Sequence, residues 1–264
     1  MTLAVFIQTL KDKARGNILA VLLVLVFVTY IVIMFPEMAK ITGIDEMMKN
    51  PAFQALLGKS VDFTSFDGFM SMEAFGLTGL VICGYIGFLS ASFLAGEIEM
   101  KTIDLLLAQP VTRVRLVIDR YTALIPAIIL LVLAMITAVF IGTQYMNISA
   151  SYDWFAYAVA FMGLFMLAFG AVSLFISAVL SDGRTAAIVS LGVLIVMYFM
   201  ETIGESVESL DIVRTFSLFH YVRYSDILVM HNLSIGNVAV LAGVTVVFLG
   251  LAAFAFRRRD INVT

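Results

Sequence analysis

Charged residues are scarce in this sequence. They make up 13% of its 264 residues, whereas hydrophobic residues make up 62%. A soluble domain usually carries about 25% charged and about 45–50% apolar residues, so the composition excludes an ordinary soluble enzyme and a disordered chain. The formal net charge of −3 leaves no basic excess to hold a phosphate backbone, so we expect no nucleic-acid partner. The remaining class is an integral membrane protein.

Cysteine and histidine are also nearly absent. The single cysteine, Cys83, excludes an intramolecular disulfide and a multi-cysteine metal centre. The two histidines, His220 and His231, are weak candidates for metal ligands, and we favour two interfacial histidines without a metal. The run Gly58-Lys59-Ser60 ends like a phosphate-binding loop, but position 53 is Phe where that loop needs Gly. We therefore expect no catalytic residues, metal or cofactor in this chain.

Long apolar runs are what the sequence has in abundance. A helix needs about 20 mostly apolar residues to cross about 30 Å of hydrocarbon. Six runs meet this length and predict an all-α integral membrane protein, with residues 1–264 forming a single transmembrane domain. The predicted spans are residues 18–35, 74–95, 121–142, 154–180, 185–203 and 238–256. Pro126 is predicted to kink the third span near its inner end.

The basic residues predict the orientation of these spans, because lysine and arginine favour the cytoplasmic side of a membrane. Most of them fall on one side, namely Lys11, Lys13, Arg15, Lys101, Arg113, Arg115, Arg120, Arg184, Arg257, Arg258 and Arg259. The other side carries only Lys40, Lys49, Lys59, Arg214 and Arg223. We therefore expect a multi-pass protein of the cell membrane with both termini in the cytoplasm.

The segment between the second and third spans has the most informative sequence. As a helix, it places Glu97, Lys101 and Asp104 on one polar stripe, and Glu97 and Lys101 form a favourable i,i+4 pair. Pro110 then breaks this helix. A bent amphipathic element of this kind suits the docking of a cytoplasmic protein. The alternative is a solvated connector at the membrane interface.

Three short motifs in the sequence match a known pattern. The matching positions are Glu97, Glu99, Thr102, Leu105-Leu106-Leu107, Gln109-Pro110-Val111 and Arg113, with Phe216–Tyr221 and Phe256–Ile261 further on. Together they resemble the type-2 ATP-binding-cassette (ABC-2) transporter permeases. The resemblance is closest to the branch of nitrous-oxide-reductase maturation and antimicrobial-peptide export permeases. Lys101 stands where that family usually has Gly.

The resemblance implies a half-transporter that embeds in membrane lipid. This chain and a second copy, or a sister permease, would pair with two cytoplasmic ATPase subunits that bind the ATP and magnesium. A coupling helix between spans two and three would contact the ATPase. Its residues would be Glu97, Glu99, Lys101, Thr102, Asp104, Leu105, Leu106, Pro110 and Arg113. Residues 2–17 would form an amphipathic interface helix, and residues 204–237 would hold short helices.

Functions from other classes remain open at this stage. An ion-coupled secondary transporter usually keeps ionisable residues in the middle of its spans. Here the only such residue within a predicted span is Glu201, at the end of the fifth. A membrane scaffold or immunity protein that docks an ATPase without transporting anything also fits the sequence. The leading hypothesis is the membrane-spanning permease subunit of an ABC exporter.

Overall fold

The computed structural model describes residues 2–40, 65–102, 112–206 and 211–259, and all regular elements within these ranges are helices. Six helical stretches are long and apolar enough to cross a membrane, which confirms the predicted number of spans. They are Ile7–Met38, Phe66–Glu99, Arg113–Met146, Tyr152–Val179, Gly183–Glu205 and Ile235–Arg258.

Some of the spanning stretches contain more than one helical element. The elements are α1 (Thr2–Met38), α4 (Phe66–Met70), the π-helix η1 (Ser71–Leu77), α5 (Thr78–Glu99), α7 (Arg113–Thr122), α8 (Leu124–Met146), α9 (Tyr152–Val179), α10 (Gly183–Ser206) and α13 (Ile235–Arg258). Three short helices separate α10 from α13, namely α11 (Asp211–Arg214), the 3-10 helix η3 (Leu218–Tyr221) and α12 (Tyr224–Leu228). They confirm that the predicted loop 204–237 is partly helical.

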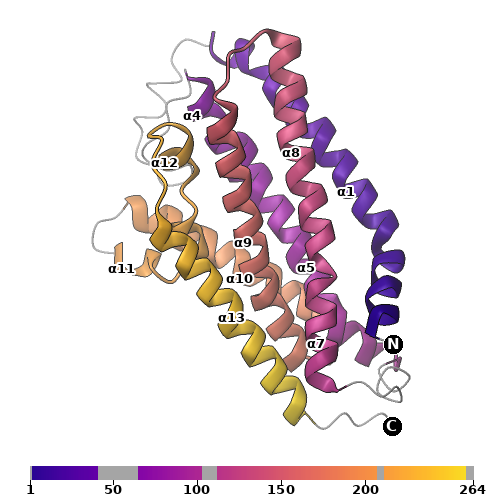
Figure 1. Cartoon of the computed structure of the whole chain (residues 1–264). Helices are drawn as coiled ribbons and strands as arrows, with labels where there is room; N and C mark the ends of the chain where they lie inside the picture. The colour runs from indigo at the N-terminus through magenta and orange to yellow at the C-terminus, as the bar shows by residue number, and fades with distance from the viewer. Residues whose placement is uncertain (1, 41–64, 103–111, 207–210, 260–264) are drawn as a thin grey trace.

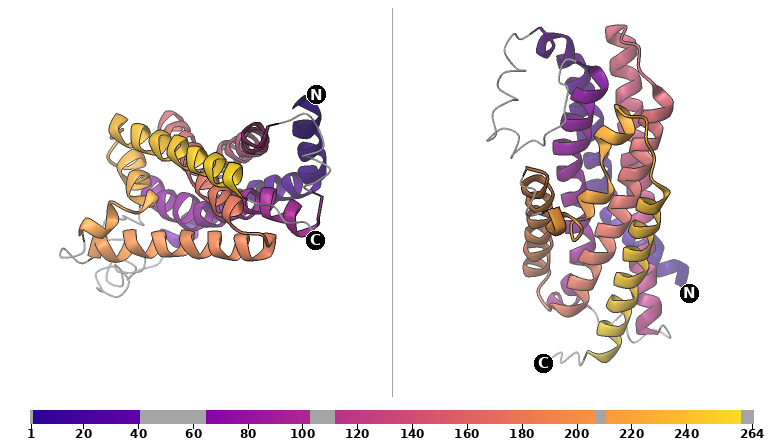
Figure 2. Two further views of the ribbon diagram at one scale, coloured as in Figure 1. Left: turned by 90° about the horizontal axis from the view of Figure 1, so that it is seen from below. Right: turned by 90° about the vertical axis from the view of Figure 1, so that its left-hand side faces the viewer.

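Helix α9 is the centre of the bundle. It packs against α5, α8, α10 and α13, while α1 lies at the edge against α8 (Figure 1). Helices α10 and α13 lie on opposite sides of the α5–α9 pair (Figure 2). Ser177 joins the central pair directly, because its hydroxyl accepts hydrogen bonds from the backbone N–H groups of Leu94 and Ala95.

The first three spans are each more than ten residues longer than the sequence predicted. The second begins at Phe66 instead of residue 74, because α4, η1 and α5 follow one another with helical backbone at Met70 and Leu77. The first is one helix of 37 residues, which extends for about 55 Å. The predicted interface helix over residues 2–17 is therefore not a separate element but the first part of α1.

The third span has a one-residue break in its helix close to Pro126, where the sequence predicted a kink. Helix α7 ends at Thr122 and α8 begins at Leu124, with Ala123 between them. Pro126 has no N–H to donate to the carbonyl of Thr122, which removes one hydrogen bond at this point of the helix.

Candidate functional site: a polar frame at one end of the bundle

One end of the bundle collects most of the residues that the sequence singled out. There α5 and α13 end and α1 and α7 begin, and we call it the lower end, as it is drawn in Figure 1. Contacts with α5 bring the start of α10 to the same end. Four predicted site residues, Asp104, Leu105, Leu106 and Pro110, fall outside the described residues.

Helix α5 ends at Glu99, inside the segment 97–108 that the sequence predicted to be one helix. The N–H of Thr102 donates to the carbonyl of Glu97 at 3.0 Å, and the N–H of Lys101 donates to that of Ile98 at 3.1 Å. Lys101 has a φ of 57°, so these bonds form the left-handed helix terminus in which glycine is favoured. The helix predicted over residues 97–108 is thus interrupted after Glu99, and Glu97 and Lys101 do not lie on successive turns of one helix.

Glu97 faces into the protein instead of lying on a polar stripe. Its Oε1 lies 2.7 Å from Nη2 of Arg120, whose side chain is only 8% exposed. Nη1 of Arg120 donates a second hydrogen bond to the hydroxyl of Thr9 at 2.7 Å, and the hydroxyl of Thr102 donates to Oε2 of Glu97. Glu97 therefore connects the end of α5 to α7 and, through Arg120, to α1.

Glu99 makes the corresponding contact with α10. Its Oε2 accepts a hydrogen bond of 2.9 Å from the backbone N–H of Gly183. A Cβ on Gly183 would lie 2.9 Å from the Cα of Gly96, so α5 and α10 touch through backbone atoms. Asp182 caps the start of α10, because its Oδ1 accepts a hydrogen bond from the backbone N–H of Thr185. This hydrogen bond lowers the pKa of Asp182.

Arg113 and Arg259 bind the last carbonyl groups of two further helices. Nη1 of Arg113 donates to the carbonyl of Phe256 at 3.3 Å and to that of Arg259. Nη1 of Arg259 donates to the carbonyls of Ala178 at 3.0 Å and Leu180 at 2.8 Å. Burial lowers the pKa of Arg259. The guanidinium groups satisfy carbonyls that a helix leaves without partners at its end.

These five side chains, Glu97, Glu99, Arg113, Arg120 and Arg259, form what we call the polar frame. It fixes the residues on both sides of segment 103–111, because Thr102 is bonded to Glu97 and Arg113 is the first residue of α7. The sequence identified Glu97, Glu99 and Arg113 but gave Arg120 and Arg259 no role beyond their charge. Arg259 lies in the motif Phe256–Ile261, but no local pattern indicates the partners of either arginine, because those partners lie far away in the sequence.

The two histidines lie in different surroundings. Nδ1 of His220 is 3.4 Å from Oε2 of Glu201, whereas His231 stacks on Trp154 with ring centroids 4.7 Å apart. Within the described ranges, no three residues of metal-ligating type lie together.

The comparison with protein families covers nearly the whole chain. The family described as ABC-2 family transporter protein matches residues 3–261. The chain belongs to the ABC-2 transporter family. This ABC-2 permease is the multi-pass membrane component of an ABC transporter. Permeases of the family lack an ATPase domain and work with ATP-binding-cassette ATPase subunits, which bind the ATP. A comparison with curated proteins gives no match.

Proposed function

We propose that this permease is half of an exporter in which residues 97–113 couple ATP hydrolysis to movement of the helices. A second copy of the chain, or a sister permease, completes the membrane part, and two ATPase subunits bind at the lower end. Residues 1–264 act as one permease domain. Its placement in the branch of nitrous-oxide-reductase maturation and antimicrobial-peptide export permeases rests on the sequence motifs alone.

The polar frame is the observation that carries this proposal. A force applied to segment 103–111 reaches α5 and α7 through the chain itself. It reaches α1 through Arg120, α10 through Glu99, and α13 through Arg113. Hydrogen bonds to charged groups are stronger than those between neutral groups, so these links transmit displacement well.

The roles of the predicted site residues change accordingly. Glu97, Glu99, Thr102 and Arg113 position the coupling segment, because their polar atoms are bonded within the permease. Leu105 and Leu106 make the apolar contact with the ATPase, and Lys101 and Asp104 make polar contacts with it. Pro110 ends the coupling helix. A few buried contact residues usually dominate the binding energy of an interface, and we assign that role to the two leucines.

The charge distribution supports a cytoplasmic position for the lower end. Arg113, Arg115, Arg120, Arg184, Arg257 and Arg258 all lie in elements that begin or end there. Because basic residues are enriched on the cytoplasmic side of a membrane, this orientation brings segment 103–111 to the compartment that holds ATP.

Co-purification tests the proposal. The variant carrying Leu105→Asp with Leu106→Asp is expected to lose its ATPase subunit, since two charges then enter an apolar contact. The matched control is Tyr145→Asp, in which an exposed residue near the end of α8 is changed. A double variant that retains its ATPase as well as the parent does would contradict the proposal. If the ATPase binds but its turnover is the same with and without the permease, a scaffold is favoured.

A further inference from the structure

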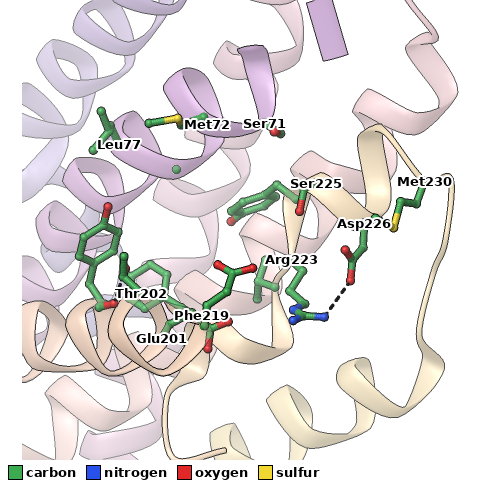
Figure 3. Close-up of a pocket in the computed structure, with 15 residues that line it drawn as sticks. Ser71, Met72, Leu77, Glu201, Thr202, Phe219, Arg223, Ser225, Asp226 and Met230 are labelled. Carbon is green, nitrogen blue, oxygen red and sulfur yellow. Dashed lines mark hydrogen bonds and ion pairs between the residues drawn. The ribbon is translucent and has the colours of Figure 1, made fainter. Parts of the chain in front are cut away.

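A cavity of about 410 Å³ lies away from the polar frame, among η1, the last turns of α10, η3 and α12. Figure 3 shows Ser71, Met72 and Leu77 on one side and Glu201, Thr202 and Phe219 on the other. Its volume is that of a small-molecule site. Neither the family assignment nor the coupling proposal gives this cavity a role.

Carboxylates outnumber cations around the cavity. Glu201, Glu205 and Asp226 line it together with Arg223. Arg223 lies 3.3 Å from Asp226, and Glu201 is bound at 2.5 Å by Arg214, whose side chain is only 8% exposed. These two pairs account for both guanidinium groups. Glu205 makes no ion pair with any residue that the structure describes.

Glu205 is the carboxylate in the lining that has no ion pair among the described residues. Oε1 of Glu201 is held by Arg214, and its Oε2 is inaccessible and lies 3.4 Å from Nδ1 of His220 without a hydrogen bond. Burial lowers the pKa of Arg214, but the hydrogen bond and charge of Glu201, with the charge of Glu205, raise it above its ordinary value. Glu205 is thus close to an arginine that Glu201 already binds. A half-buried carboxylate without its own counter-ion favours a cation from outside.

The rest of the lining is aromatic and apolar. Tyr198, Phe219 and Tyr224 contribute rings, and Met72, Leu77 and Met230 contribute flexible apolar side chains. Aromatic faces attract organic cations within about 6 Å of the ring centre. An anion would meet the carboxylates, and a fully hydrated metal ion would gain nothing from the rings and thioethers.

The helix on the opposite wall is irregular. Residues Ser71–Leu77 form a π-helix within the second span, and Ser71, Met72, Gly76 and Leu77 all face the cavity. Single π turns inside α-helices occur frequently at functional sites. The irregular turn shapes this wall, and Gly76 keeps it free of a side chain.

We propose that this cavity binds an organic cation with an apolar body, with Glu205 as its main counter-ion and Glu201 as the second carboxylate. The aromatic rings hold the apolar part, and the carboxylates select the charge. The proposal rests on the cavity and not on coupling at the lower end, so either can fail alone.

Binding of two ions with the same shape and opposite charge tests this directly. Tetraphenylphosphonium and tetraphenylborate carry the same four phenyl groups. The full-length permease is purified in dodecyl maltoside, whose headgroup is uncharged, and saturable binding of each radiolabelled ion is measured by equilibrium dialysis against empty micelles. We expect saturable binding of tetraphenylphosphonium only.

Two variants locate the binding. Glu205→Gln should weaken tetraphenylphosphonium binding about tenfold, because it removes the unpaired charge and breaks no ion pair described in the structure. Glu37→Gln is the control, since Glu37 is exposed and pairs with Lys40 away from the cavity. Absence of saturable binding, equal binding of tetraphenylborate, or unchanged binding by Glu205→Gln would each overturn the proposal. If binding is found, two competitors distinguish the sources of the cation. Displacement of tetraphenylphosphonium by dihexanoyl phosphatidylcholine assigns the cavity to a lipid headgroup. Displacement by benzyltrimethylammonium but not by the lipid assigns it to a free cation.

Discussion

Replacing Glu97 by glutamine removes the charge that compensates a buried arginine. In the parent, the carboxylate of Glu97 lies 2.7 Å from Arg120, and the two side chains are 20% and 8% exposed. Removal of one partner of a buried ion pair costs about 3–5 kcal/mol, because the other charge stays buried without compensation. The partial exposure of Glu97 and the remaining bond from Arg120 to Thr9 place the expected loss near the lower value, about 3 kcal/mol.

An ion pair between two exposed side chains provides the control. Lys40 binds Glu37 at 2.7 Å, and the two side chains are 69% and 78% exposed. Exposed pairs contribute about 0.2–1 kcal/mol, so Lys40→Met should change the free energy of unfolding by less than about 1 kcal/mol.

Unfolding by sodium dodecyl sulfate, followed by helical circular dichroism in mixed micelles, measures both variants. The double variant Glu97→Gln with Arg120→Met should recover much of the stability, because it leaves no buried charge. If Glu97→Gln is as mild as Lys40→Met, or if the double variant is the least stable of the set, the Glu97–Arg120 contact does not stabilise the lower end.

Three further substitutions test separate contacts by thermal unfolding in detergent. Gly183→Ala should lower the free energy of unfolding by about 2 kcal/mol, because the added Cβ would lie 2.9 Å from the Cα of Gly96. Gly96→Ala should be tolerated, because a Cβ at that position would have no atom within 4 Å. Lys101→Gly should stabilise by about 1 kcal/mol relative to Lys101→Ala, because only glycine relieves the left-handed backbone at φ 57°; equal stability would refute that reasoning. Ser177→Ala should lower the free energy of unfolding by about 1–2 kcal/mol, because it removes hydrogen bonds to α5. Ser92→Ala should cost less, because the hydroxyl of Ser92 bonds within its own helix. The reverse order would contradict the packing of α5 on α9.

Hydropathy was enough to predict the number of spans, and the position of Pro126 predicted an irregularity in the third one, where the helix breaks at Ala123. Both depend on local properties of the chain, namely the apolar length of a segment and a missing N–H. The extension of the second span to Phe66 was not predicted. Residues 66–73 include Asp67 and Glu73, which lowered the apparent hydropathy although most of their neighbours are buried.

The polar contacts were predicted least well. A helical wheel paired Glu97 with Lys101, but tertiary packing brings Arg120 to Glu97 from another helix. Likewise, the sequence marks Glu201 only as the end of a span, whereas Arg214 and His220 both contact it in the structure. Such partners are set by how the helices pack, and a single sequence contains no periodic signal for them.

Site-specific photo-crosslinking tests the central claim that segment 103–111 contacts the ATPase. p-Benzoylphenylalanine is placed at Leu105 or Leu106, and at exposed Tyr145 as the control, and native membranes are irradiated. The account predicts a covalent adduct from the two leucine positions with a protein that is retained on immobilised ATP, and none from position 145. The same ATP-binding adduct from position 145, or no such adduct from either leucine position, would contradict it.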